Sequence, residues 1–260
     1  MRIILLLLYS TLASSQPFSQ AHAHNDYEHD HPLFDALHYG FTSVEADIYL
    51  IDGKLLVSHA RPIFKARTLE QLYLAPLDSI IRAHQGRVYQ GYDGPFYLMI
   101  DIKSDGLAAY PVLKEALAHY STLYHSPDHR HVGVGTQGPV IIFLSGDRPV
   151  NTVLKDPDAA MALDGRPEDV GKGYAVAVMP VISDTYRKWS TWNGKDQPTT
   201  EDLLRIKDLA RRVHAEGKKL RLWAIPDNPV AWKELLNAGV DFINTDNLKG
   251  LNQFLMSGRN

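Results

Sequence analysis

The sequence contains no cysteine among its 260 residues. This absence excludes disulfide cross-links, thiolate metal sites, a cysteine nucleophile and lipid attachment through a cysteine. A chain of this length with 45% hydrophobic residues buries enough apolar surface to fold without such cross-links. The absence of disulfides is therefore compatible with an exported protein.

The sequence also has no excess of basic residues. It carries 27 Lys and Arg against 30 Asp and Glu, which gives a formal net charge of −3. A surface that follows a nucleic-acid backbone usually shows a basic excess, so we expect no nucleic-acid partner. A small, locally anionic substrate stays compatible with this charge.

A long apolar run occurs only at the N-terminus. Ile3–Tyr9 follow Arg2, and small residues surround Ala13–Ser15, which is typical of a signal peptide. The run is shorter than the roughly 20 residues that a membrane span needs. The sequence therefore predicts a signal peptide at 1–15, one mature domain at 16–260 without a transmembrane segment, and export to the periplasm or beyond. A buried first strand or helix is the alternative interpretation of this run.

Short apolar runs alternate with longer amphipathic ones up to the C-terminus. The predicted strands are Ser19–His24, Ser43–Tyr49, Lys54–Ser58, Pro95–Ile102, Val140–Leu144, Ala159–Leu163, Ala175–Pro180, Leu220–Ile225 and Asp241–Asn244. The predicted helices are Pro32–Tyr39, Leu69–His84, Leu107–Tyr120, Thr200–Glu216 and Pro229–Ala238. This alternation predicts an α/β fold with a parallel sheet. About eight repeats in one unit favour a closed (β/α)₈ TIM barrel over a doubly wound sheet, and residues 124–138 are expected to form a lid or a loop insertion.

Two carboxylates stand two positions apart in one predicted strand. Glu45 and Asp47 lie within Ser43–Tyr49, so both side chains point to the same face, which in a barrel is the interior. Buried side by side they would repel each other unless a cation neutralised them. Asp101 ends a later apolar strand, with Lys103 on the same face. Oxygen ligands select a hard cation, so we expect one Mg²⁺ or Ca²⁺ on Glu45, Asp47 and Asp101. Taken singly, each acid is more often a solvated strand end.

Two histidines follow predicted strands on either side of these acids in the sequence. A neutral imidazole can take a proton from a nucleophilic hydroxyl, while a protonated one gives a proton to a leaving alkoxide. His24 and His59 are the residues predicted to share this work, although a single histidine is more often structural. Cleavage of a P–O bond fits, because a metal and Lys103 would offset the charge on the phosphoryl oxygens.

The same residues resemble the phospholipase-C-like phosphodiesterase superfamily, which includes glycerophosphodiester phosphodiesterases and spider-venom-type sphingomyelinases D. Its members share a strand-one histidine, a Glu-x-Asp metal pair and a second histidine, which correspond here to His24, Glu45, Asp47 and His59. The third metal carboxylate would be Asp101. The resemblance implies a barrel of this type.

Three segments resemble a narrower branch, that of the altered-inheritance-of-mitochondria proteins and their bacterial homologues. They are His24–Tyr27, Ser43–Asp47 and Arg67–Tyr73. Leu222–Ala224 and the run Gly239–Asp246 resemble the last two strands of the superfamily, so the similarity spans nearly the whole mature chain.

The resemblance implies a metal-dependent phosphoric diester hydrolase acting on a small glycerophosphodiester- or phospholipid-like substrate. Attack by a neighbouring substrate hydroxyl would give a cyclic phosphate. Glycerophosphodiesterases have Arg-Gly after the first histidine, whereas this chain has Asn25 and Asp26. The missing phosphate contact would have to come from Asn25, Lys103 or another residue. Trp223 is predicted to line the pocket against a head group or to pack the barrel mouth, and we expect a monomer.

Two other functions start from the same residues. His22 and His24 on one strand face, with Asp246, would begin a zinc site of the amidohydrolase type. That site needs histidines after two later strands, which instead end in Leu163–Gly165 and Ile182–Asp184. An exported, non-catalytic barrel that binds a phosphorylated or sugar ligand is the third possibility, and retention of the full set of polar residues argues against it.

Overall fold

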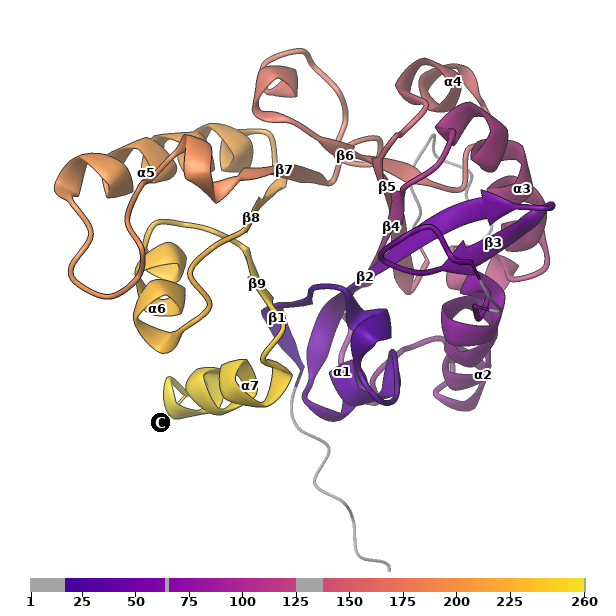
Figure 1. The fold of residues 1–260 in the computed structure, drawn as a ribbon, viewed down its shortest axis with the longest axis horizontal. Coiled ribbons are helices and arrows are strands. Elements are labelled where there is room, and N and C mark those ends of the chain that lie inside the picture. The colour runs from indigo at the N-terminus through magenta and orange to yellow at the C-terminus, as the bar shows by residue number, and fades with distance from the viewer. Residues whose placement is uncertain (1–16, 64–65, 125–137, 260) are drawn as a thin grey trace, which may run out of the picture.

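The computed structural model describes residues 17–63, 66–124 and 138–259, which form a closed barrel of parallel strands with helices around it (Figure 1). The predicted signal peptide and nearly all of the predicted lid segment lie outside these residues. No helix within the described ranges is long and apolar enough to cross a membrane.

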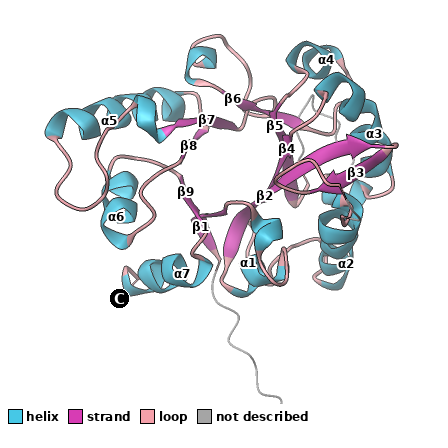
Figure 2. Ribbon diagram, viewed as in Figure 1, coloured by secondary structure: helices cyan, strands magenta, loops and turns pink. Residues whose placement is uncertain are grey.

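The helices lie outside the ring of strands (Figure 2). The strands are β1 (Phe18–Ala23), β2 (Phe41–Ile51), β3 (Lys54–Val57), β4 (Phe96–Ile102), β5 (Val140–Gly146), β6 (Ala162–Gly165), β7 (Val181–Thr185), β8 (Lys219–Trp223) and β9 (Phe242–Thr245). The helices are α1 (Phe34–His38), α2 (Ala75–Ala83), α3 (Gly106–Ala118), α4 (Val150–Lys155), α5 (Thr200–Ala215), α6 (Pro229–Asn237) and α7 (Leu248–Ser257).

The sheet closes because β1 pairs in parallel with both β2 and β9. The remaining neighbours follow in chain order from β4 to β9, with β4 beside β2. β3 pairs antiparallel with β2 as a hairpin return outside the ring. The predicted (β/α)₈ TIM barrel is confirmed.

One predicted strand is wrong. Ala175–Pro180 contains a turn, and β7 begins immediately after Pro180. Proline has no N–H to donate to a central ladder, so the strand starts beyond it. The carbonyl of Pro180 still accepts from the backbone N–H of Lys219 at 2.9 Å.

Two helices, α4 and α7, were not predicted. α4 has only six residues, too few to show a clear helical period. α7 is capped by Asn247, whose side chain accepts from the N–H of Gly250 at 2.9 Å. It buries Leu248 and Leu251.

The barrel interior has two layers. The lower layer is an apolar plug of Tyr97, Met99, Phe143, Ala162, Val181 and Phe242, separate from the larger core between strands and helices. Because inward positions recur every second residue, the next inward side chains are Asp101, Ser145, Asp164, Ser183 and Asn244. We call this upper set, together with Glu45, Asp47 and Arg221, the polar layer. It lies at the carboxyl ends of the strands, where barrel enzymes hold their working residues.

Candidate active site

Three carboxylates converge in the polar layer. Asp47 of β2 and Asp101 of β4 are register partners, and Glu45 lies one inward position earlier on β2. Each offers an oxygen within 4.8 Å of the others, and we call these residues the acidic trio. The structure thus brings together the three predicted ligands, while their binding of a metal stays a prediction.

The trio fits a cation because two of its oxygens lack partners. Asp47 Oδ1 and Asp101 Oδ1 are buried and accept no hydrogen bond from the residues that the structure describes. The other oxygen of each faces Lys103, whose Nζ lies 3.2 Å from Asp47 Oδ2 and 2.9 Å from Asp101 Oδ2. Burial, then the charge of Glu45, raises the pKa of Asp47 to about 6 despite Lys103. A bound cation would relieve this repulsion and give the unpaired oxygens a partner.

Arg221 is one of the residues of this site that the sequence did not predict. Its Nη2 donates to Glu45 Oε2 at 2.7 Å, and its Nε donates to Asn244 at 2.9 Å. Burial alone would raise the pKa of Glu45, but the Arg221 guanidinium and a hydrogen bond from His22 lower it to about 2. β8 has the sequence Lys-Leu-Arg-Leu-Trp. Alternation was the available signal, because it places Arg221 on the face opposite Leu220 and Leu222.

His24 follows β1 and is held by Asp246. Its Nδ1 lies 2.7 Å from Asp246 Oδ1, and the backbone N–H of Asp246 donates in turn to Asp227 at 3.2 Å. Burial lowers the pKa of His24, but the bond to Asp246 and the charge of Glu45 outweigh it, so the pKa is raised. The ring is therefore fixed in orientation at the edge of the trio.

His59 borders the trio beside Asp47 and is more exposed than His24. Its Nδ1 lies 3.4 Å from Asp47 Oδ2 and 3.4 Å from the Tyr27 hydroxyl. Tyr27, which was not predicted, can donate to Asp47 Oδ2 at 2.8 Å or to Asn25 Oδ1 at 3.0 Å. His59 thus contacts Asp47, whereas His24 interacts with Glu45 only electrostatically. Asn25 is linked to Asp47 through the Tyr27 hydroxyl.

The remaining predicted residues have different surroundings. Trp223 ends β8 at the mouth with 42% of its surface exposed, so its contact with substrate stays a prediction. His22 is buried, and its Nδ1 lies 2.7 Å from the Ser43 hydroxyl. Its pKa is lowered to about 4, chiefly by burial. In the described part of the chain only the trio forms a metal-ligand group of three, so a zinc site on His22 and His24 has no geometric support.

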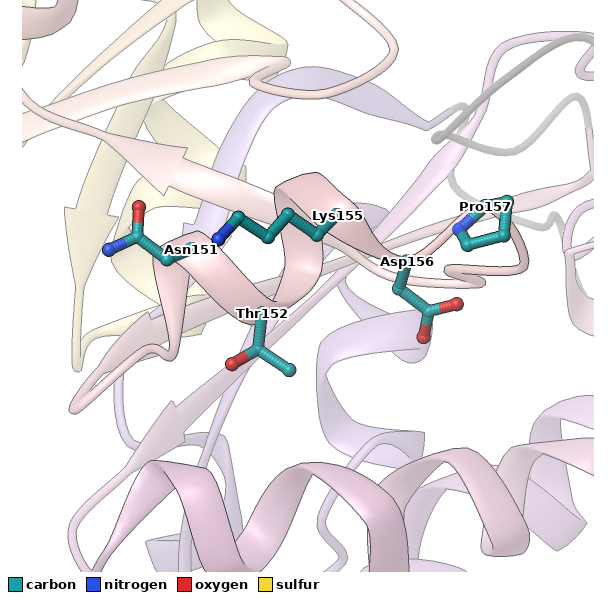
Figure 3. Close-up of a pocket in the computed structure, with 5 residues that line it drawn as sticks. All are labelled: Asn151, Thr152, Lys155, Asp156 and Pro157. Atoms are coloured by element: carbon teal, nitrogen blue, oxygen red, sulfur yellow. The ribbon is translucent and has the colours of Figure 1, made fainter.

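A separate hollow lies beside α4 (Figure 3). It has a volume of about 490 Å³ and is lined by Asn151, Thr152, Lys155, Asp156 and Pro157. Asp156 already accepts from Tyr110 at 2.9 Å and from Lys114 at 2.5 Å. Neither the trio nor a histidine lines this hollow, so it is separate from the candidate active site.

Comparisons with known proteins support the assignment made from the sequence. The chain is 26% identical over 254 residues to the altered inheritance of mitochondria protein 6 homolog of Arthroderma benhamiae, covering 87% of this chain and 81% of that protein. It is 28% identical over 273 residues to altered inheritance of mitochondria protein 6 of Eremothecium gossypii, covering 91% and 69%.

A solved structure has the same fold. The glycerophosphodiester phosphodiesterase from Agrobacterium tumefaciens aligns with a TM-score of 0.50 at 10% identity, covering 92% of this chain and 100% of that one. Residues 219–249 match the glycerophosphoryl diester phosphodiesterase family model. Residues 14–161, more than half of the chain, match the model of the AIM6-like phosphodiesterase domain. The chain therefore belongs to the AIM6-like phosphodiesterase family.

Proposed function

We propose that the protein is a metal-dependent phosphoric diester hydrolase that acts on a small glycerophosphodiester- or phospholipid-like substrate. The observation that carries the proposal is the acidic trio, with two buried oxygens unpaired, bordered by His24 and His59. Family membership supports phosphodiester chemistry, and the oxygen-only ligand set supports Mg²⁺ or Ca²⁺.

His24 is suited to be the base. Asp246 engages Nδ1, which leaves Nε2 to accept a proton from the attacking hydroxyl. A hydroxyl of the substrate next to the phosphate would give a cyclic phosphate, and water would give direct hydrolysis. His59, in its protonated form, would donate a proton to the leaving alkoxide.

Lys103 and a cation bound by the trio would neutralise the negative charge of the phosphate. When bound, the divalent cation supplies positive charge against a phosphoryl oxygen. Lys103 holds two members of the trio apart and in place, and its ammonium group can also donate to the phosphate. The Tyr27 hydroxyl lies within hydrogen-bond distance of both Asn25 and Asp47. Asn25 would therefore be a further polar contact for a substrate bound at the trio.

The test is metal-dependent hydrolysis of bis(p-nitrophenyl) phosphate. We expect turnover with Mg²⁺ or Ca²⁺, loss of turnover with a chelator, and recovery when the cation is returned. H24A should reduce kcat at least about a hundredfold, the scale of general acid–base groups, with unchanged circular dichroism. H59A should do the same on glycerophosphoserine, whose alkoxide leaving group needs a proton, whereas p-nitrophenolate does not. Turnover that is indifferent to the chelator and to both substitutions would reject the proposal.

The exported location and the monomeric state are proposals from the sequence. The N-terminal pattern at residues 1–15 supports export. Fractionation of cells expressing the full chain should recover a shortened protein outside the cytoplasm, and light scattering should give the mass of one chain. A full-length cytoplasmic product would contradict the first, and a dimer mass the second.

A further inference from the structure

The half of the polar layer across from β1 and β2 holds a second group of polar side chains. Asp164 of β6 is fully buried. It accepts hydrogen bonds from Ser145 at 2.8 Å, from Ser183 at 2.6 Å and from Arg166 Nη1 at 2.7 Å. A buried carboxylate is costly unless it is paired and hydrogen-bonded, so these contacts hold the Arg166 side chain in one position.

Arg166 keeps donors free on the side away from Asp164. Its Nη1 also meets the carbonyls of Asp164 at 3.3 Å and Gly165 at 3.0 Å, whereas its Nη2 has a single long contact of 3.4 Å with Ser145. A guanidinium has five N–H donors. About a quarter of the Arg166 side chain is exposed, so solvent reaches part of it.

A second guanidinium lies beside the first. Arg148 donates from Nη1 to the Asp164 carbonyl. Burial, followed by the positive charge of Arg166, lowers the pKa of Arg148. The nearby carboxylates do not form ion pairs with all the donors of the two arginines. Asp169 pairs with Lys172 at 2.9 Å, and Glu168 affects Arg148 only electrostatically. Two half-buried cations that repel each other are stabilised by an anion placed between them.

Arg166 is linked to the acidic trio through Ser145. Ser145, which Arg166 contacts, is the register partner of Asp101, and neighbouring strands are about 4.8 Å apart. The charge of Asp101 is also felt at Arg166. A ligand whose phosphate was bound at the trio would therefore lie where the charge of Arg166 acts on it.

We infer that Arg166 and Arg148 form an anion-binding subsite for phosphoryl or carboxylate oxygens of the substrate, an inference that rests on the proposed function. Asn25 stands where the glycerophosphodiesterases have an arginine, and the subsite supplies a cationic contact from the opposite wall. Arg166 would make this contact directly, while Asp164, Ser145 and Ser183 position it.

Calorimetric titration with inorganic phosphate tests the subsite without catalysis. We expect R166Q and R148Q each to bind phosphate at least tenfold more weakly than the unmodified protein. The matched control is K207Q, which removes one exposed cation from α5, and should stay within twofold. Equal affinity in R166Q, R148Q and K207Q, or no phosphate binding by the unmodified protein, would overturn the inference.

R166Q leaves the Asp164 carboxylate buried without its cation, which can unfold the protein. R148Q avoids this, because Arg148 contacts only the backbone carbonyl of Asp164. The double variant D164N/R166Q removes both charges together and provides a second folded background. Loss of phosphate binding in these variants with an unchanged melting temperature supports the subsite, and retained binding contradicts it.

Kinetics distinguish two sources of the anionic oxygen. Bis(p-nitrophenyl) phosphate offers only the scissile phosphate, whereas glycerophosphoserine adds a carboxylate. If Arg166 binds the scissile phosphate, R166Q should raise KM at least tenfold for both substrates. If Arg166 binds a second anionic group, R166Q should raise KM only for glycerophosphoserine. An unchanged KM for both contradicts a role in substrate binding. The unmodified protein could fail to hydrolyse both compounds while its phosphate binding still depends on Arg166. That result would reject the proposed function and would still support the anion-binding subsite.

Discussion

Asp26 lies between Asn25 and Tyr27, and its side chain is fully buried. We expect ionisation of this carboxyl group to make the protein less stable as pH rises. Its Oδ2 accepts from the N–H of Leu33 at 2.6 Å and from the Tyr73 hydroxyl at 2.9 Å, while Oδ1 has no partner. Burial, opposed by these two bonds, raises the pKa of Asp26 from 3.8 to about 7.

The sign follows from proton binding. Because the folded pKa lies above the unfolded one, the folded state holds the proton more tightly between pH 4 and 7. The stability that Asp26 contributes is complete below the unfolded pKa and is lost as pH rises through about 7. With one pKa unit worth 1.36 kcal/mol, the loss between pH 5 and pH 8 is about 2 to 3 kcal/mol.

Asp26→Asn removes this titration while keeping the shape of the side chain. The variant should therefore gain about 2 to 3 kcal/mol relative to the unmodified protein as the buffer changes from pH 5 to pH 8. The constant cost of the new amide cancels in that comparison. Urea unfolding at pH 5, 6, 7 and 8 measures it, with Asp93→Asn as control because the Asp93 side chain is 84% exposed. A gap between variant and unmodified protein that stays constant across this range would refute the reasoning.

Three further predictions concern the site. Gly146→Ala should destabilise the protein by about 1–3 kcal/mol more than Gly171→Ala, as measured by urea unfolding. Both glycines have positive φ, but only at Gly146 would a Cβ lie 2.0 Å from Asp101 Oδ1. Asp246→Asn should lower the pKa of His24 in an NMR titration, and an unchanged pKa would contradict the role of Asp246. Arg221→Met should lower stability by about 3–5 kcal/mol by leaving the buried Glu45 carboxylate without its cation. Stability should recover in the double variant that adds Glu45→Gln.

Local alternation was enough to predict the trio. Glu45 and Asp47 interrupt an apolar strand at a spacing of two, so their common face follows from strand geometry alone. Asp101 ends the next parallel strand, and parallel ladders bring strand ends to one rim. The number of strand–helix repeats predicted a closed barrel, and closure is what brings these strand ends together around one site.

The contact between Arg221 and Glu45 could not be predicted, and the sequence placed Asp246 near His24 only as part of a zinc site. Arg221 is 176 positions from Glu45, and Asp246 is 222 positions from His24. Both contacts depend on closure of the ring between β9 and β1, which no local pattern encodes. The β7 error has a local cause, since apolar Ala175–Pro180 resembles a strand more closely than the polar-ended segment that follows it.

The apolar plug and the chemistry above it depend on one another. Asp101 and Ser145 each stand two positions after a plug residue, Met99 and Phe143. A slip of either strand by one residue would exchange the inward and outward faces and remove both side chains from the layer. The plug also excludes water beneath the trio, and charges interact more strongly where water is absent. The packing that fixes the register is therefore also what makes the unpaired oxygens of Asp47 and Asp101 costly without a cation.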